Sequence, residues 1–197
     1  MRIAVLYGGR SEEREISLRS GAAVAKGLEK NGYEVMLVDA RSGLVDSLQM
    51  LKPDLAFIAL HGQFGEDGTV QGLLEMMNIP YTGPGVLASA ACMNKMITKK
   101  LLVHDGIPTP DYVLLDGKRT VIDAVVWGDQ VRNKLGAPVV VKAASQGSSI
   151  GTILARLDED IVPAIEEALR FDQQLVVERM IQGRECTVPV MGNSNPQ

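Results

Sequence analysis

Short apolar runs in the first half of the chain alternate with stretches of helical periodicity. The runs occupy residues 3–7, 34–39 and 55–60, and the apolar positions between the first two recur at close to the helical period. Residues 55–60 are apolar throughout, which is typical of a strand covered on both faces. This alternation predicts βαβ units, and therefore a parallel sheet joined by right-handed crossovers.

The pattern changes after about residue 94. Two apolar runs, at residues 138–142 and 152–156, are joined by a polar loop without a helix, which indicates an antiparallel hairpin. The same part of the chain contains further helical and extended stretches. Helices are expected at residues 122–135 and 161–169, and strands at residues 112–115, 175–178 and 185–191.

These patterns predict an α/β fold class. We place a Rossmann-like domain with a parallel sheet at residues 1–94, an α+β domain at residues 95–179, and the start of a third segment at residues 180–197. With 46% apolar and 22% charged residues, the composition is that of an ordinary soluble globular protein.

Charge and hydropathy exclude several classes of partner. A net charge of −4 gives no reason to expect nucleic acid or an anionic membrane. No apolar run approaches the roughly 18–20 residues that span a bilayer, and the chain opens directly into a strand rather than a signal peptide. We therefore expect a cytoplasmic protein. Cys92 and Cys186 lie outside any CxxC pattern, so we expect both to be buried, reduced thiols.

Two glycines follow the first apolar run, where a strand turns into a helix. Gly8 and Gly9 permit positive φ and a close approach to the helix N-terminus, which favours anions. Because residue 13 is Glu, the segment is not the GxGxxG dinucleotide fingerprint. Taken alone, the turn favours a tight connection without a ligand.

Carboxylates and a histidine follow these strands at the same predicted sheet edge. Glu12, Glu13 and Glu15 lie at one helix start, where the macrodipole stabilises them for structural reasons. An acid there can also hold a substrate ammonium group, and position alone does not separate the two roles. His61 directly follows the third run, at the edge where open α/β folds bind ligands. A structural histidine is the alternative.

A lysine and a glycine-rich loop follow the apolar run at residues 139–141. Lys142 places a positive charge near the sheet interior, and burying that charge is unfavourable unless an anion pairs with it. The loop at residues 144–151 carries three serines and two glycines, so it can close over phosphates, although it lacks the Walker pattern. The alternative is a plain hairpin turn, with Lys142 and Lys95 both solvated.

Two acids bracket the connector at residues 179–184. A connector with free backbone groups can bind a purine edge, with an acid such as Glu178 or Glu185 reaching the ribose hydroxyls. The alternative is a pair of exposed acids bound to Arg179 and Arg184, which contributes little to stability.

In this order, these motifs resemble the D-alanine–D-alanine ligases of the ATP-grasp superfamily over essentially the whole chain. The resemblance implies an ATP-dependent carboxylate–amine ligase that joins two D-alanines through an acyl phosphate, for peptidoglycan precursor synthesis. It implies a substrate domain at residues 1–94, a small ATP-grasp subdomain at residues 95–179 and the start of the C-terminal ATP-grasp subdomain. ATP, D-alanine and Mg²⁺ are the implied small-molecule partners, and full-length members are expected to be homodimers.

The resemblance also implies a role for each matching residue. Glu15 would hold the ammonium of the first D-alanine, His61 would line that subsite, and Ser148 would orient the substrate and Glu15. Lys95 and Lys142 would contact the ATP phosphates. The adenine and ribose contacts would come from Glu178, Ile181 and Glu185.

Other parts of the implied ligase site are expected beyond residue 197, including the magnesium ligands. We therefore expect an ATP-grasp domain that is incomplete at its C-terminus, and little activity from residues 1–197 alone. Residues 193–196 match an N-x-N-P metal motif in letters only, because no acidic strand precedes them, and they predict a hairpin turn. Two alternatives stay open: a non-catalytic nucleotide-binding remnant, or an ATP-grasp ligase for another amino or hydroxy acid.

Overall fold

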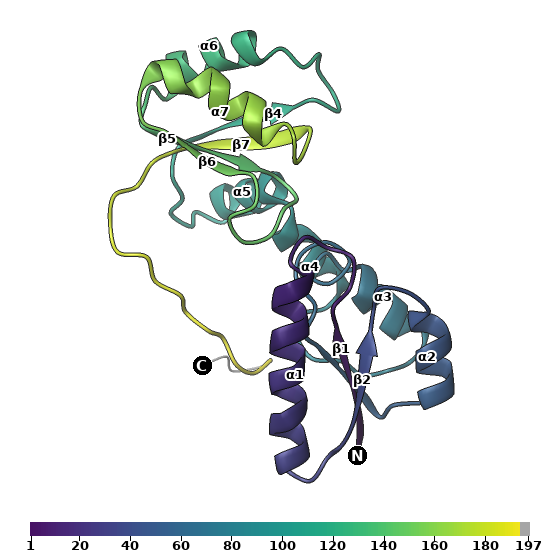
Figure 1. Cartoon of the computed structure of the whole chain (residues 1–197). Coiled ribbons are helices and arrows are strands. Elements are labelled where there is room, and N and C mark those ends of the chain that lie inside the picture. Colours follow the sequence, from purple (N-terminus) through teal and green to yellow (C-terminus); the bar gives the residue numbers. More distant parts are fainter. Residues whose placement is uncertain (194–197) are drawn as a thin grey trace.

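Two β-sheets, each with its own helices, make up residues 1–193, the part of the chain that this computed structural model describes (Figure 1). The first sheet is parallel, with the strand order β2-β1-β3, which confirms the predicted βαβ arrangement. Its elements are β1 (Arg2–Tyr7), α1 (Arg14–Lys30), β2 (Glu34–Asp39), α2 (Leu44–Leu51), β3 (Leu55–Ile58), α3 (Thr69–Met76) and α4 (Val86–Met93).

Strand β1 is buried on both faces. Its four central residues are all buried, and successive side chains of a strand point to opposite sides of the sheet. Ile3 and Val5 pack with Ala25 of α1. Ala4 and Leu6, on the other face, pack in a cluster with side chains of α2 and α3. Since helices cover both faces, the carboxyl edge of the sheet is the place left for a ligand.

The second sheet is antiparallel, with the strand order β4-β7-β5-β6, and β5 and β6 form the predicted hairpin. Its elements are α5 (Lys95–His104), β4 (Tyr112–Asp116), α6 (Ala124–Lys134), β5 (Val139–Ala143), β6 (Thr152–Ala155), η1 (Asp158–Asp160), α7 (Ile161–Ala168) and β7 (Gln174–Arg179). The predicted boundary after residue 94 falls between α4 and α5.

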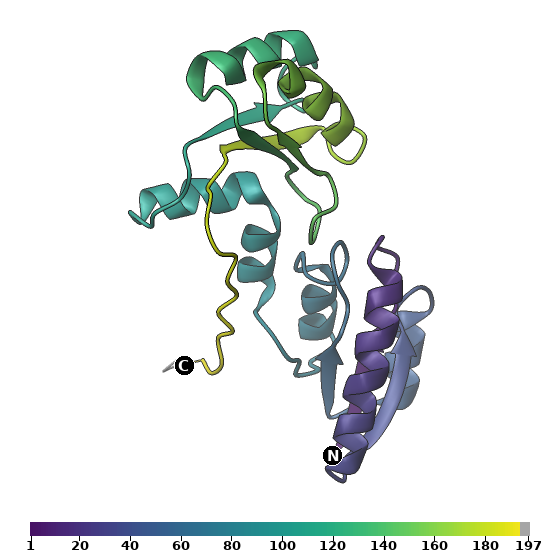
Figure 2. The ribbon, with the colours of Figure 1, turned by 60° about the vertical axis from the view of Figure 1, so that its left-hand side comes forward.

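Helices also cover both faces of the second sheet (Figure 2). Trp127 of α6 and Ile165 of α7 pack in the larger cluster, on one face. Met96 of α5 packs with Ala144 and Val176 on the other face. Helix α5 therefore lies between the second sheet and α4, at the junction of the two halves of the molecule (Figure 2).

The predicted strand at residues 185–191 is wrong. This segment has no regular secondary structure, and residues 181–193 are exposed throughout. It pairs with no strand in the described part of the chain, so its backbone N–H and C=O groups hydrogen-bond with water. Residues 194–196 of the predicted hairpin turn lie outside the described residues.

Two smaller features also differ from the sequence analysis. Helix α4 was not expected, because its alanines and serine give no apolar stripe at helical spacing. Cys92 and Cys186 were expected to be buried, and both are exposed: Cys92 faces cavities beside α4, and Cys186 lies in the irregular segment. Among residues 1–193, no helix combines the length and apolarity that crossing a membrane requires.

Candidate functional site

The turn after β1 lies at the carboxyl edge of the first sheet and is fixed by a buried serine. Gly8 and Gly9 have φ of 71° and 78°, a conformation that glycine adopts without strain. The Gly8 N–H donates to Ser17 Oγ (2.9 Å), and that hydroxyl donates to Ala59 O (2.6 Å). Ser17 therefore ties the ends of β1 and β3 to α1.

An ion pair holds the other side of this turn. Arg14 donates two hydrogen bonds to Asp39 (2.9 and 2.6 Å) and one to Gly9 O (3.0 Å). The hydrogen bond from Arg14 holds the pKa of the Asp39 carboxyl well below its usual value. Because this pair joins α1 to the ends of β1 and β2, Arg14 has a structural role.

His61 follows β3 and packs against the first turns of α1. Its Nε2 lies 3.1 Å from Ser20 Oγ, and its Nδ1 lies 3.8 Å from Glu66 Oε1. The Ser11 hydroxyl donates to His61 O (2.7 Å) and accepts from the Glu13 N–H (3.3 Å). One serine therefore fixes the position of His61 relative to the start of α1.

The carboxylate that faces the second half of the molecule belongs to Glu13. A Cβ at Gly62 would lie 2.6 Å from Glu13 Oε2, and a Cβ at Gly147 would overlap the same oxygen. Glu13 precedes the buried Ser17 by four residues and shares its helical face. Glu15 points about 200° away around the helix and is exposed. The geometry thus favours Glu13 over Glu15 as the acid of this site, and the spacing to Ser17 is the signal that could have shown it.

A cavity of about 500 Å³ lies between the two halves of the molecule. The first half contributes His61 and Glu66 to its lining, and the second contributes Lys95, Gln146 and Gly147. Its walls therefore carry an ammonium group from α5 opposite acidic and imidazole groups from the first sheet. Such a space suits a small molecule with charges of both signs.

Lys95, the first residue of α5, is tied to the loop at residues 144–151. Its Nζ donates to Gln146 O (2.5 Å), and its backbone N–H donates to Ala144 O (2.9 Å). Burial lowers the pKa of Lys95, and the positive charge of Lys142 lowers it further. The two lysines therefore face one region, as predicted, and an anion between them would relieve their repulsion.

Glu178 on β7 is a largely buried carboxylate that pairs with two lysines. Its Oε2 lies 2.7 Å from Lys142 Nζ, and its Oε1 lies 3.1 Å from Lys99 Nζ. Burial alone would raise the pKa of Glu178, but the hydrogen bonds and charges of Lys142 and Lys99 lower it below its usual value. A second cavity, of about 310 Å³, is lined by Lys95 and by all three members of this cluster. Sequence analysis missed Lys99, although it lies one helical turn after Lys95.

The remaining predicted residues lie outside these contacts. Ser148 is exposed and has a φ of 52°, a left-handed conformation that is uncommon for residues other than glycine and often marks a functional loop. Ile181 and Glu185 are exposed in the irregular segment after β7, so the structure does not bring them to Glu178. Their roles stay predictions.

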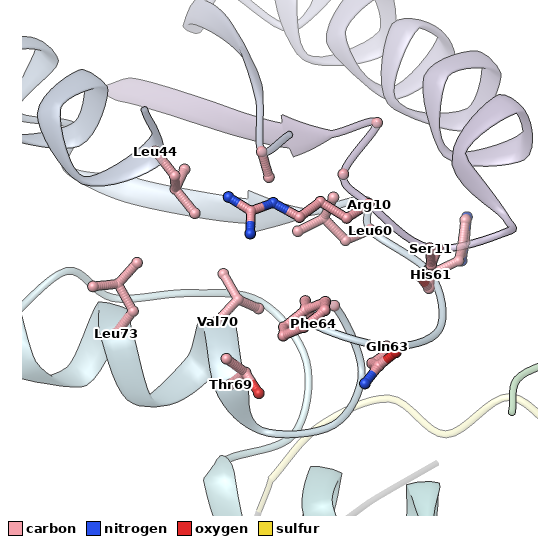
Figure 3. Close-up of a pocket in the computed structure, with 14 residues that line it drawn as sticks. Arg10, Ser11, Leu44, Leu60, His61, Gln63, Phe64, Thr69, Val70 and Leu73 are labelled. Carbon is pink, nitrogen blue, oxygen red and sulfur yellow. Dashed lines mark hydrogen bonds between the residues drawn. The ribbon is translucent and has the colours of Figure 1, made fainter. Parts of the chain in front are cut away.

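A third cavity, of about 170 Å³, lies on the α2 and α3 side of the first sheet (Figure 3). Leu44, Val70 and Leu73 line it, and the Arg10 side chain extends across it. His61 borders this space as well, at the end nearest α1 (Figure 3). His61 therefore lies between this cavity and the one between the two halves, and it lines both.

Within residues 1–193, no group of three or more His, Cys, Asp or Glu side chains is arranged to hold a metal ion. The acids whose charges act on Lys95 are Asp172, Glu178 and Glu13, and they come from three separate segments of the chain. The residues described here therefore do not fit a magnesium site of their own.

A parallel sheet with a glycine turn, followed by an antiparallel sheet with paired lysines and a serine–glycine loop, defines a protein of the ATP-grasp class. A family model described as "D-ala D-ala ligase N-terminus" matches residues 2–45 and 41–84, and one described as "D-ala D-ala ligase C-terminus" matches residues 101–197. The chain belongs to the D-alanine–D-alanine ligase family.

Individual relatives agree with this assignment. The chain is 48% identical to a D-alanine–D-alanine ligase of Desulforamulus reducens and 49% identical to one of Desulforudis audaxviator, and all of it aligns in both cases. It spans 64% and 63% of the length of these two relatives.

Solved structures show the same similarity in three dimensions. A D-alanine–D-alanine ligase from Bacillus anthracis, in a structure complexed with ATP, superposes with a TM-score of 0.79 at 36% identity, over 93% of this chain and 60% of that one. The enzyme from Coxiella burnetii superposes with a TM-score of 0.81 at 31% identity, over 100% of this chain and 68% of that one.

Proposed function

We propose that this chain forms the first-substrate subsite and part of the nucleotide site of an ATP-dependent ligase that joins two D-alanines. Because the chain spans 62–64% of its first relatives, the proposal concerns the protein at the length of those relatives. The reaction class is carboxylate–amine ligation through an acyl phosphate, which serves peptidoglycan precursor synthesis.

One observation carries the proposal: Lys95 lines both the 500 Å³ cavity and the 310 Å³ cavity. The first cavity has groups for a small amino acid, and the second has the lysines for a polyphosphate. A phosphoryl transfer needs its two reactants in contact and its negative charge neutralised. A lysine shared by both cavities meets each requirement at the place where carboxylate and phosphate would meet.

Each residue of the proposed site has a separate role in binding or in phosphoryl transfer. Glu13 accepts hydrogen bonds from the ammonium of the first D-alanine, and His61 and Ser148 bound the same subsite. Lys95 and Lys142 neutralise the phosphates while the D-alanine carboxylate attacks the γ-phosphorus and ADP leaves. The amine of the second D-alanine then attacks the acyl carbon, releasing inorganic phosphate and a proton.

The nucleotide base is assigned to the region around Glu178. The proposal gives Glu178 and Ile181 to adenine and Glu185 to the ribose. Mg²⁺ would accompany ATP, but residues 1–193 do not fit a site for it, so none of the steps assigned to this chain depends on the metal. We also propose a cytoplasmic location and a homodimer for the protein at the length of its relatives.

A coupled ADP-release assay tests the function. The chain extended at its C-terminus to the length of its relatives should release ADP in the presence of D-alanine, ATP and magnesium, and product analysis should find D-alanyl-D-alanine. Residues 1–197 alone should show no turnover. Turnover that requires D-lactate or D-serine in addition to D-alanine would redirect the proposal to another ATP-grasp ligase. No turnover with any of these substrates would favour a non-catalytic protein.

A further inference from the structure

Lys99 is a buried lysine next to the nucleotide region. Its side chain is only 6% exposed, and its Nζ lies 3.1 Å from Glu178 Oε1. The ammonium also donates to Thr109 Oγ1 (2.5 Å) and Pro110 O (3.4 Å) and lies 5.3 Å from the centre of the Tyr112 ring. These contacts come from two separate segments, residues 109–112 and β7, so Lys99 is fixed in place.

Lys142 holds the other oxygen of the same carboxylate but is less enclosed. Its Nζ lies 2.7 Å from Glu178 Oε2, and its side chain is 27% exposed, against 6% for Lys99. Only Glu178 is within hydrogen-bonding distance of the Lys142 ammonium among the described residues. Both lysines border the cavity, but Lys142 can turn further into it, whereas Thr109, Pro110 and Glu178 hold the Lys99 ammonium in place.

A buried carboxylate that loses its only counter-ion is strongly destabilised. Without Lys99, any movement of Lys142 toward a phosphate would leave Glu178 in that condition, since its side chain is 13% exposed. With Lys99 present, one oxygen of Glu178 keeps a charged partner throughout. The arrangement thus separates a fixed counter-ion from a movable one.

We propose that Lys99 is a positioning residue: it stays paired with Glu178 and so releases Lys142 to bind a nucleotide phosphate. Lys99 itself touches no phosphate in this role. The inference rests on the proposed function, which assigns Lys142 to the ATP phosphates.

Substitution of Lys99 by methionine separates this role from a general effect on folding. The side chain of Met is close in length to that of Lys, and Lys100→Met makes the same change at the exposed neighbouring position. In Lys99→Met, Lys142 becomes the sole counter-ion of Glu178. Its ammonium should then be held more tightly and react more slowly.

The first experiment needs no nucleotide. Residues 1–197 of the wild type, Lys99→Met and Lys100→Met are treated with a limiting amount of acetic anhydride, and acetylation of Lys142 is measured by mass spectrometry relative to Lys134. Lys142 acetylation should fall several-fold in Lys99→Met and stay unchanged in Lys100→Met. Equal acetylation of Lys142 in all three proteins would overturn the inference.

The second experiment measures phosphate binding in the chain extended to the length of its relatives. Inorganic triphosphate serves as the probe, because it needs no adenine contact from Glu178. Lys99→Met should weaken triphosphate binding by about tenfold. The double variant Lys99→Met/Glu178→Gln should recover the wild-type affinity, because a neutral amide no longer holds Lys142.

The outcomes separate the two proposals. If the wild type binds neither triphosphate nor ATP, the proposed nucleotide site fails, and acetylation still decides whether Lys99 frees Lys142. If the wild type binds triphosphate and Lys99→Met binds it equally well, the inference fails while the nucleotide site stands. A merely structural role would weaken both variants that lack Lys99, so the absence of recovery in the double variant would also overturn the inference.

Discussion

The Glu13 carboxylate, at the start of α1, faces Gly147 in the loop between β5 and β6. The fit is close enough that a Cβ at Gly147 would overlap Glu13 Oε2 and lie 3.4 Å from Gly62 Cα. Three segments, the start of α1, the loop after β3 and the β5–β6 loop, therefore meet through an acid and two glycines. This contact joins the two halves of the molecule at the proposed D-alanine subsite.

Gly147→Ala should displace the loop at residues 144–151 or the Glu13 side chain, since the added methyl group overlaps Glu13 Oε2. We expect the KM for D-alanine at the first subsite to rise by about tenfold or more, the result of a misplacement of about an ångström. Steady-state kinetics of the protein at the length of its relatives provides the measurement. Gly27→Ala, in α1 and outside the proposed site, is a matched control, because nothing lies within 4 Å of a Cβ at that position. Equal kinetics in the two variants would show that the contact is not needed.

Glu13→Gln should reduce kcat/KM for D-alanine by about a hundredfold, because the amide removes the charge that pairs with the substrate ammonium. Glu15→Gln, two residues away on the exposed side of α1, should leave kcat/KM within about twofold of the wild type. The two variants carry the same chemical change. The reverse order of effects would return the acid role to Glu15, as the family resemblance first implied.

The change from Glu15 to Glu13 shows what could not be predicted from the sequence. The parallel first sheet and the β5–β6 hairpin were predictable, because the connection between two apolar runs decides whether the strands are parallel or antiparallel. The strand orders of the two sheets were not predicted. The family resemblance gave both Lys95 and Lys142 to the ATP phosphates, and the two side chains do line one cavity. The choice among three neighbouring glutamates was not predictable, because it depends on which helical face packs against the sheet.

Other residues were not predictable for a different reason. Lys99 reads in the sequence as one of two adjacent lysines on a helix, and only tertiary packing shows that Lys99 is buried while Lys100 is exposed. The segment at residues 185–191 has the alternating pattern of a strand, yet a strand requires a partner, and a pattern within one segment carries no information about its partner.

The two sheets should unfold with separate responses to core substitutions, because their apolar clusters share no residue. Trp127, the only tryptophan, packs in the cluster of the second sheet, so its fluorescence reports on that half. Ile165→Ala should lower the free energy of unfolding seen by Trp127 by about 2–5 kcal/mol.

Leu74→Ala, in the core of the first sheet, is the matched control and should leave the fluorescence transition within about 0.5 kcal/mol of the wild type. Urea denaturation followed by fluorescence and by circular dichroism gives both values. If both variants lower the free energy of unfolding seen by fluorescence, residues 1–94 and 95–179 unfold as one cooperative unit. That result would argue against the predicted domain division.

The Glu178 cluster should make stability depend on pH in the acid range. The pKa of the Glu178 carboxyl is lowered from an ordinary value of 4.5, so the folded state favours the ionised carboxylate. A group of this kind contributes stability that is fully present above the unfolded pKa and is lost as the pH falls through the lower, folded pKa. Glu178→Gln should therefore be less stable than the wild type by about 1–3 kcal/mol near pH 7, and this difference should shrink steadily below pH 4.5. Urea denaturation of both proteins across that range gives the difference directly, and because Asp39 titrates equally in the two, its contribution cancels. A difference that stays constant with pH would show that the two lysines do not favour the charged form of Glu178.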